Sequence, residues 1–248
     1  MSDLDSPAIF YSPHQDDESI GMAGAIREHK EAGRSVHLVL LTNGINQGLL
    51  DIMNGANGPC PLAANCRQPD HALGLSMDDM IGGRTAEFYA AAEQLGVDEV
   101  HTIGLNDDDV VTDRAGFIER IKEVILDFEG QFPGASHKLV SGWRDQVPSE
   151  PNPNPTHSAC RDAAEALRDR IADFRFHWTY AYFREQSART ADFVLDLTDS
   201  QFAAKRQAIL EYNRWEPDNG RYALGYHSVS TLLENAYSDP REYIDVLH

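Results

Sequence analysis

The chain has 248 residues, of which 42% are hydrophobic, and it carries a formal net charge of −19. This length favours one α/β domain, and no run approaches the ~18 apolar residues of a membrane span. The acidic charge argues against nucleic acid as a partner, and residues 1–7 lack the basic and apolar regions of a secretory signal. We therefore expect a soluble, cytoplasmic protein with a small-molecule partner; the oligomeric state, a homo-oligomer included, stays open.

The first part of the chain alternates between strand and helix patterns. Residues 8–12 are a β-prone run that ends at Pro13, residues 18–32 have apolar positions near helical spacing, and residues 36–41 are an apolar run. This order indicates a parallel βαβ unit. Residues 43–81 then lose the periodicity and contain several turn dipeptides. We expect a long insert loop there, of the kind that is usually functional.

The alternation resumes after the insert. Helices are expected at 84–95, 117–128, 157–172 and 199–212, and strands at 100–105, 138–141 and 193–197. The tail, about 215–248, is aromatic and irregular. These patterns predict a single domain over 1–248 with a mostly parallel, doubly wound sheet. The loops that follow residues 8–12, 100–105 and 138–141 should therefore converge at one edge of the sheet.

The segment with the densest chemistry follows the first predicted strand. Residues 12–18 read Ser-Pro-His-Gln-Asp-Asp-Glu, and a core would not tolerate such charge without partners. His14 and Asp17 lie three residues apart, so one turn can aim both at a common point. An imidazole and a carboxylate are ordinary zinc ligands, and a catalytic zinc usually takes three protein ligands. His157, at a predicted helix start, is the natural third, which leaves Asp16 free to act as a base.

Residues 13–18, Pro-His-Gln-Asp-Asp-Glu, match the P-H-x-D-D-E signature of the LmbE-like, or PIG-L, deacetylases, and the chain resembles this family. The second family motif, H-P-D-H-x-A, corresponds to residues 154–159. Weaker likenesses lie at residues 84–87, 95–97, 107 and 205–212, so the resemblance extends over about residues 8–212.

The resemblance implies a fold, a cofactor and a set of roles. The fold would be LmbE-like: α/β and Rossmann-like, with a mostly parallel sheet flanked by helices. The activity would be zinc-dependent removal of an N-acyl group, such as acetyl, from an amino sugar or a conjugate of N-acetylglucosamine. Zn²⁺ would be bound by His14, Asp17 and His157, Asp16 would be the general base, and Arg84 and Asp107 would contact the substrate.

Two positions depart from the family pattern. Asn154 stands where the first His of the second motif is usual, and Thr156 stands where the Asp is usual. An Asn side chain can donate a hydrogen bond to an oxyanion but cannot supply a proton. We therefore assign Asn154 a catalytic role as a hydrogen-bond donor to the oxyanion. We expect Asp16 to return the proton to the leaving amine. A turn next to Pro155 would explain Asn154 equally well.

Other functions and plainer roles compete with this interpretation. The rival functions are an amidase that acts on a thiol conjugate of an amino sugar and a sugar-binding module with a decayed site. A dinucleotide-binding protein is disfavoured because no GxGxxG follows the first strand. His14 and Asp17 could merely cap a helix, Arg84 could pair with Asp78 or Asp79 on the surface, and Asp107 could belong to a solvated acidic turn. The insert and the tail suggest a specialised substrate, such as a natural-product intermediate.

The three cysteines and His227 are not predicted to take part in the site. Cys60, Cys66 and Cys160 are too few for a disulfide framework, and Cys60 and Cys66 lack the CxxC spacing of a structural zinc site. Cys60 and Cys66 could pair with each other, but free thiols are expected in the cytosol. His227 lies beyond the resemblance and is expected to be an ordinary core or surface histidine rather than a pocket residue.

Overall fold

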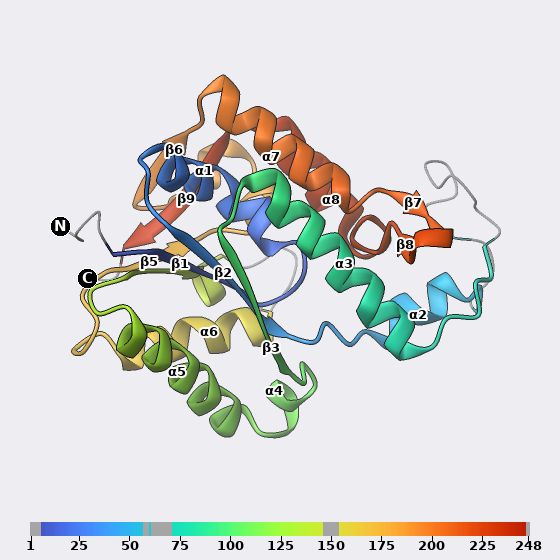
Figure 1. The fold of residues 1–248 in the computed structure, drawn as a ribbon, viewed down its shortest axis with the longest axis horizontal. Helices are drawn as coiled ribbons and strands as arrows, with labels where there is room; N and C mark the ends of the chain where they lie inside the picture. Colours follow the sequence, from blue (N-terminus) through green and yellow to red (C-terminus); the bar gives the residue numbers. More distant parts are fainter. Residues whose placement is uncertain (1–5, 57–59, 61–70, 146–153, 247–248) are drawn as a thin grey trace.

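The computed structural model describes residues 6–56, 60, 71–145 and 154–246, and shows a sheet with helices on both faces (Figure 1). The sheet has seven strands in the order β3-β2-β1-β4-β5-β9-β6. The strands are β1 (Ala8–Ser12), β2 (Val36–Thr42), β3 (Glu99–Leu105), β4 (Ser136–Val140), β5 (Phe174–His177), β6 (Phe193–Asp196) and β9 (Arg241–Val246). β1 to β5 pair in parallel, and β9 runs antiparallel to both β5 and β6. The expected α/β fold with a mostly parallel sheet is confirmed.

Two layers of helices cover this sheet. The helices are α1 (Ala23–Glu31), α2 (Gln47–Met53), α3 (Met77–Leu95), α4 (Asp109–Thr112), α5 (Arg114–Gln131), α6 (Pro155–Ala166), α7 (Asp199–Glu211) and α8 (Leu224–Ser238). Figure 1 shows α1, α3, α7 and α8 on one face and α5 and α6 on the other. β1 and β2 are buried along their whole length, as expected for parallel strands covered on both sides.

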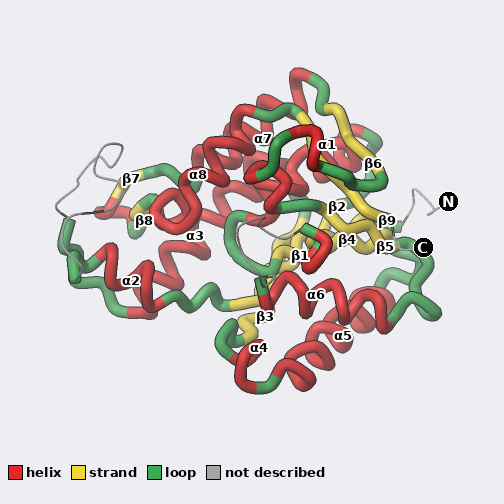
Figure 2. The backbone as a smooth tube through the Cα atoms, turned by 180° about the vertical axis from the view of Figure 1, so that it is seen from behind, coloured by secondary structure: helices red, strands yellow, loops and turns green. Residues whose placement is uncertain are grey.

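The insert contains more regular structure than the sequence predicted. Helix α2 lies within the expected loop 43–81, and α3 begins at Met77 rather than at Arg84. Ser76 and Asp79 form a reciprocal capping box at the start of α3, which fixes this earlier beginning. Gly82 and Gly83 in the first turns had hidden the helical pattern in the sequence. Figure 2 shows α2 at the far end of the molecule, beside the small β7–β8 hairpin (Trp215–Glu216 and Arg221–Tyr222).

The tail is likewise not irregular. It supplies helix α8 and strand β9, and β9 lies inside the sheet between β5 and β6. The sequence did not indicate β9 as a buried strand, because it contains Glu242 and Asp245, which are both fully buried. Glu242 accepts hydrogen bonds from the backbone N–H groups of Gly24 and Ala25 at 2.8 and 3.1 Å. Such buried charges are tolerated only with partners, which the sequence pattern does not display.

The strand order places the chemistry at one edge of the sheet. The chain passes from β1 to β2 on one side and continues with β4 and β5 on the other, so β1 and β4 flank the point where the order reverses. In doubly wound folds, ligands bind beyond the carboxyl ends of strands at this switch point. The loops after β1, β3 and β4 do converge there, since His14 contacts both Asp107 and His157. Among the described residues, none of the helices combines the length and the apolar content needed to cross a bilayer.

Candidate metal centre

The loop after β1 is held in a strained conformation. Asp16 has a φ of 128°, a region that residues other than glycine rarely occupy. Its side chain is buried, and the following turn, η1 (Glu18–Met22), is a π-helix that leads into α1. Strain of this kind persists only where the surroundings enforce it, and it clusters at functional sites.

Glu18 is the residue that holds this loop in place. Its carboxylate is fully buried and accepts hydrogen bonds from the Ser19 hydroxyl and the Tyr212 hydroxyl, both at 2.6 Å. It also accepts one from the backbone N–H of Asp16 at 3.2 Å. Burial raises the pKa of Glu18 to about 7, although these donors oppose the shift. Sequence reasoning missed this role of Glu18, because its partner Tyr212 lies far away in the chain.

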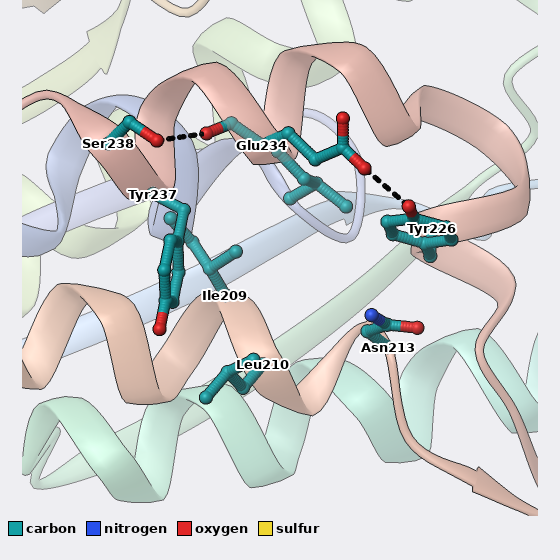
Figure 3. Close-up of a pocket in the computed structure, with 8 residues that line it drawn as sticks. Ile209, Leu210, Asn213, Tyr226, Glu234, Tyr237 and Ser238 are labelled. Carbon is teal, nitrogen blue, oxygen red and sulfur yellow. Dashed lines mark hydrogen bonds between the residues drawn. The ribbon is translucent and has the colours of Figure 1, made fainter. Parts of the chain in front are cut away.

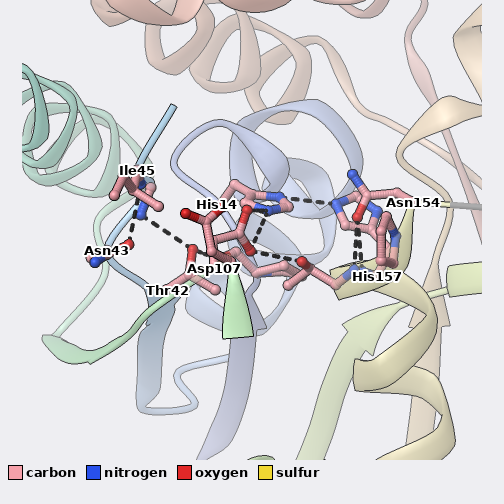
Figure 4. Close-up of polar contacts among 12 residues, drawn as sticks. His14, Thr42, Asn43, Ile45, Asp107, Asn154 and His157 are labelled. Atoms are coloured by element: carbon pink, nitrogen blue, oxygen red, sulfur yellow. Dashed lines mark hydrogen bonds and ion pairs between the residues drawn. The ribbon is translucent and has the colours of Figure 1, made fainter. Parts of the chain in front are cut away.

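Three donor atoms converge at the end of β1, as Figure 4 shows for the two histidines. Asp17 Oδ2 lies 3.4 Å from His14 Nδ1 and 3.2 Å from His157 Nε2, and the two histidine nitrogens are 3.3 Å apart. Donors that bind a four-coordinate zinc at about 2.0–2.1 Å are themselves separated by about 3.3–3.4 Å. The side chains of His14, Asp17 and His157 therefore fit a zinc-sized cation without rearrangement.

The charges of the site also suit a cation. Burial alone lowers the pKa of His14, but the carboxylates of Asp107 and Asp17 outweigh it and raise that pKa to about 10. A proton on His14 thus occupies the place that a metal's charge would take. Burial and the neighbouring Asp17 carboxylate raise the pKa of Asp16 well above its usual value. Burial would also raise the pKa of Asp17, but His157 and His14 hold it well below its usual range.

Asp107 lies behind His14 rather than in a solvated acidic turn. Its two carboxylate oxygens are 3.2 and 3.3 Å from His14 Nε2, the nitrogen that faces away from Asp17 and His157 (Figure 4). The Thr156 hydroxyl donates to Asp107 Oδ1 at 2.7 Å. A carboxylate on the outer nitrogen of a metal-binding histidine is a common support, because it fixes the ring and its tautomer. Substrate contact by Asp107 remains a prediction.

The Asn154 side chain has three hydrogen-bond partners. Its Oδ1 accepts hydrogen bonds from the backbone N–H groups of Thr156 and His157, at 3.0 and 3.1 Å, and thereby caps α6. Its Nδ2 donates to the Tyr180 hydroxyl at 3.1 Å. Tyr180, whose ring stacks on His157 with centroids 5.2 Å apart, was missed because it belongs to no motif. Burial raises the pKa of Tyr180 well above its usual value, so the phenol keeps its proton.

Arg84 is buried and does not pair with Asp78 or Asp79 on the surface. Its Nη1 donates to the carbonyl oxygen of Gly44 at 2.7 Å, and its Nη2 donates to that of Gln15 at 3.4 Å. The same Nη2 lies 3.9 Å from Asp16 Oδ2. Arg84 therefore ties the insert to the loop after β1 and places a positive charge beside Asp16; substrate contact by this residue remains a prediction.

These residues line a cavity of about 180 Å³. The polar side is formed by the metal-ligand set with Asp16 and Asn154, and the apolar side by Ile45, Val229 and Leu232. A larger groove of about 370 Å³ lies between α7 and α8 (Figure 3). Its lining is mainly apolar, with Ile209, Leu210 and Tyr237, and among the described residues it holds no group of metal ligands. The smaller cavity is therefore the candidate for chemistry.

Solved structures with the same fold include proteins of more than one activity. The N,N′-diacetylchitobiose deacetylase from Pyrococcus horikoshii has a TM-score of 0.59 at 14% identity, and the match covers 98% of this chain and 84% of that one. The zinc-inhibited form of teicoplanin deacetylase Orf2 has a TM-score of 0.56 at 16% identity, covering 98% and 99%. The 4-carboxy-2-hydroxymuconate hydratase GalB from Pseudomonas putida has a TM-score of 0.51 at 16% identity, covering 98% and 96%. At these identities the likeness establishes the fold alone.

Sequence comparison identifies the family. No curated protein matches the sequence. The profile of the PIG-L family, described as GlcNAc-PI de-N-acetylase, matches residues 9–186, which include His14, Asp17 and His157. The resemblance seen in residues 13–18 and 154–159 is thus confirmed over most of the chain, and this protein belongs to the PIG-L family.

Proposed function

We propose that this protein is a zinc-dependent hydrolase that removes an N-acyl group, acetyl in the simplest case, from an amino sugar or a conjugate of N-acetylglucosamine. The observation that carries the proposal is the triangle of His14 Nδ1, Asp17 Oδ2 and His157 Nε2, with sides of 3.2–3.4 Å, in a cavity that also holds Asp16. Family membership and the deacetylases among the structural neighbours support the same reaction class.

Asp16 is the proton carrier in this proposal. A bound zinc supplies a Lewis acid that polarises the acyl carbonyl and makes water more acidic. The Asp16 carboxylate accepts a proton from the attacking water and returns it to the leaving amine nitrogen, so one group fills both roles in sequence. The guanidinium of Arg84 is held in place by the carbonyl oxygens of Gly44 and Gln15. It lies 3.9 Å from Asp16 Oδ2 and so keeps this carboxylate oriented.

Stabilisation of the developing oxyanion is assigned to Tyr180 together with Asn154. The Asn154 amide is already used, because Oδ1 caps α6 and Nδ2 donates to the Tyr180 hydroxyl. A hydroxyl that accepts this hydrogen bond keeps its own proton for donation into the cavity that it lines. Asn154 then acts through Tyr180, which revises the direct role that the sequence suggested.

The cavity limits what part of a substrate can be enclosed. Ligand pockets usually measure about 300–1,000 Å³, so a cavity of about 180 Å³ holds the acyl group and the adjoining part of one sugar ring. The apolar wall formed by Ile45, Val229 and Leu232 suits the acyl chain. The remainder of a conjugate would extend outside, which is consistent with a larger natural-product intermediate.

The uses of Asn154 and Thr156 count against a decayed sugar-binding module. Asn154 caps the helix that carries His157, and the Thr156 hydroxyl supports Asp107. Both departures from the family motif are therefore integrated into the geometry of the site.

The first experiment is metal analysis of protein purified without chelator, followed by an acyl-release screen. We expect zinc in the wild type, less zinc in His157→Ala, and zinc without turnover in Asp16→Asn, which replaces the base by a near-isostere. The screen should include N-acetylglucosamine, larger N-acyl conjugates and thiol conjugates of amino sugars. A wild type that takes up no metal after reconstitution would refute the proposal, and turnover of thiol conjugates alone would support the amidase instead.

A further inference from the structure

A second group of metal-ligating side chains lies away from the cavity. Cys60 and His71 come from the insert, and His227 comes from the first turn of α8. All three residues are buried, and one donor atom from each lies within 4.8 Å of the others. Their closeness was hidden in the sequence, because more than 150 positions separate His71 from His227.

Both histidines are oriented as metal-bound histidines usually are. His71 Nδ1 lies 3.1 Å from the carbonyl oxygen of Met53, and His227 Nδ1 lies 2.7 Å from that of Ala223. Because a carbonyl oxygen only accepts hydrogen bonds, each Nδ1 must carry the proton, and each Nε2 then holds the lone pair. Backbone carbonyls fix the tautomer of metal-binding histidines in this way.

His71 Nε2 has no hydrogen-bond partner among the described residues, although the side chain is only 7% exposed. A buried acceptor without a donor is unfavourable, and binding of a metal ion to this nitrogen would remove that cost. The imidazole rings of His71 and His227 meet edge to face, with centroids 5.1 Å apart. The Trp215 ring packs against both, at 5.7 and 6.1 Å, and forms an apolar wall around them.

The donor types indicate which ion fits. Cysteine thiolate and histidine imidazole are the ligand types of structural zinc sites, which usually have four protein ligands, so these three residues would leave the fourth position to another donor. Zinc ligands lie within about 4 Å of one another, so the present spacing of up to 4.8 Å requires only a small closure. Hard ions such as Mg²⁺ or Ca²⁺ are disfavoured because they prefer oxygen donors.

The position of the group explains what a metal would stabilise. The insert packs against the start of α8 through a small apolar cluster, whose buried members are Leu49, Leu50, Met53 and Met80 from the insert and Leu224 from α8. A cluster of this size buries little apolar surface, and the binding free energy of a metal would add to the stability of the insert. An ion shared by Cys60, His71 and His227 would fix the insert to the start of α8. The next residues of α8, Ser228 and Val229, line the candidate catalytic cavity.

We propose that Cys60, His71 and His227 form a second, structural zinc site that fastens the insert against α8 and thereby shapes one wall of the cavity. This site is independent of the one formed by His14, Asp17 and His157. It differs in chemistry as well, because only the second site contains a thiolate. That difference lets a single spectroscopic measurement separate the two.

The test is metal analysis combined with cobalt substitution of the full chain. We expect about two zinc ions per wild-type chain. The Co²⁺ form should show thiolate-to-cobalt charge-transfer absorption, which a His–Asp–His site cannot produce. Cys60→Ala should lose this absorption and one metal. Cys160→Ala, which removes another buried thiol, should keep both. His157→Ala should keep the absorption while it loses the other metal.

The outcomes separate this inference from the proposed function. One metal in the wild type without thiolate absorption would overturn the second site and leave the catalytic proposal intact. Absorption in a wild type whose single metal survives His157→Ala would support the second site and refute the catalytic one. If Cys60→Ala does not fold, the metal content and the cobalt absorption of the wild type and of His157→Ala still show whether the second site exists. A thiol titration of the denatured, unreduced and metal-free chain that finds Cys60 in a disulfide would also overturn the inference.

Discussion

Asp107 shows how one residue's contacts define its role. Its carboxylate faces His14 Nε2 and accepts from Thr156, so it can hold the His14 ring in a metal-binding orientation. We expect Asp107→Asn to lower the affinity for zinc by roughly 10–100-fold, because an amide is a weaker partner for the imidazole. Competition with a chelator measures this. Asp108→Asn, on the exposed neighbour, is the matched control, and equal affinities in the two variants would remove the supporting role from Asp107.

The Tyr180 hydroxyl lines the cavity, and its proposed role in stabilising the oxyanion can be tested directly. If its hydroxyl donates to the oxyanion, Tyr180→Phe should reduce kcat by about 10²–10³-fold while KM changes little, because the bond forms mainly in the transition state. Zinc content should stay at the wild-type level. Tyr237→Phe on α8, in the separate groove, is the control. A change confined to KM would show that Tyr180 binds substrate rather than stabilising charge.

The sequence indicated which donor groups lie together at the end of β1, but not which residues support them. His14, Asp17 and His157 could be placed together because they follow β1 and β4 at one edge of a parallel sheet. Glu18 and Tyr180 could not, since their partners Tyr212 and Asn154 are set by tertiary packing. Neither the buried carboxylate of Glu18 nor the phenol of Tyr180 produces a periodic pattern in the sequence.

Among the elements, the turn after β4 packs closely against the first turns of α6. Gly142 has a φ of 65°, and a Cβ there would lie 2.7 Å from the carbonyl oxygen of His157 and 2.9 Å from Arg161 Cβ. Gly142→Ala should therefore displace the start of α6, cost about 1–2 kcal/mol of unfolding free energy from the backbone alone, and weaken zinc binding. Calorimetry and metal titration measure the two effects.

A matched glycine makes that experiment specific. Gly130 lies on an exposed part of α5, where an added Cβ would meet nothing within 4 Å. Gly130→Ala should raise stability by about 0.5–1 kcal/mol, because alanine favours helix, and should leave zinc binding unchanged. If Gly142→Ala behaved like Gly130→Ala, the turn would not position His157.

Two strands with a plain apolar pattern were predicted, whereas the strand that buries carboxylates was not. β1 and β2 read as strands directly, whereas β9 contains Glu242 and Asp245. Lys205 Nζ lies 3.4 Å from Glu242 Oε1, and the Ser141 hydroxyl donates to Asp245 at 2.7 Å. These partners come from α7 and from the end of β4, so only the folded chain reveals why the tail can enter the sheet.

Across the fold, buried carboxyl groups link separate helices and strands. Glu87 on α3 accepts hydrogen bonds from the backbone N–H groups of Leu224 and Gly225 at 2.7 and 2.9 Å, which joins α3 to the start of α8. Asp145 accepts one from the backbone N–H of Tyr180 at 2.6 Å, which joins the turn after β4 to the segment after β5. Burial raises the pKa of each carboxyl to about 8.

These two groups make stability fall as the pH rises through neutrality. Between their ordinary pKa values of 4.5 and 3.8 and the folded value of about 8, the unfolded chain is ionised while the folded chain keeps the protons. Each group can then lower the free energy of unfolding by at most about 1.4 kcal/mol per pH unit, and the loss ends above the folded pKa. Glu87→Gln should make this slope shallower between about pH 5 and 8. Denaturant unfolding across that range measures it, with Glu93→Gln on the exposed side of α3 as the control. An unchanged slope in Glu87→Gln would mean that Glu87 is ionised in the folded protein, stabilised by the two N–H groups of α8 and by the charge of Arg84.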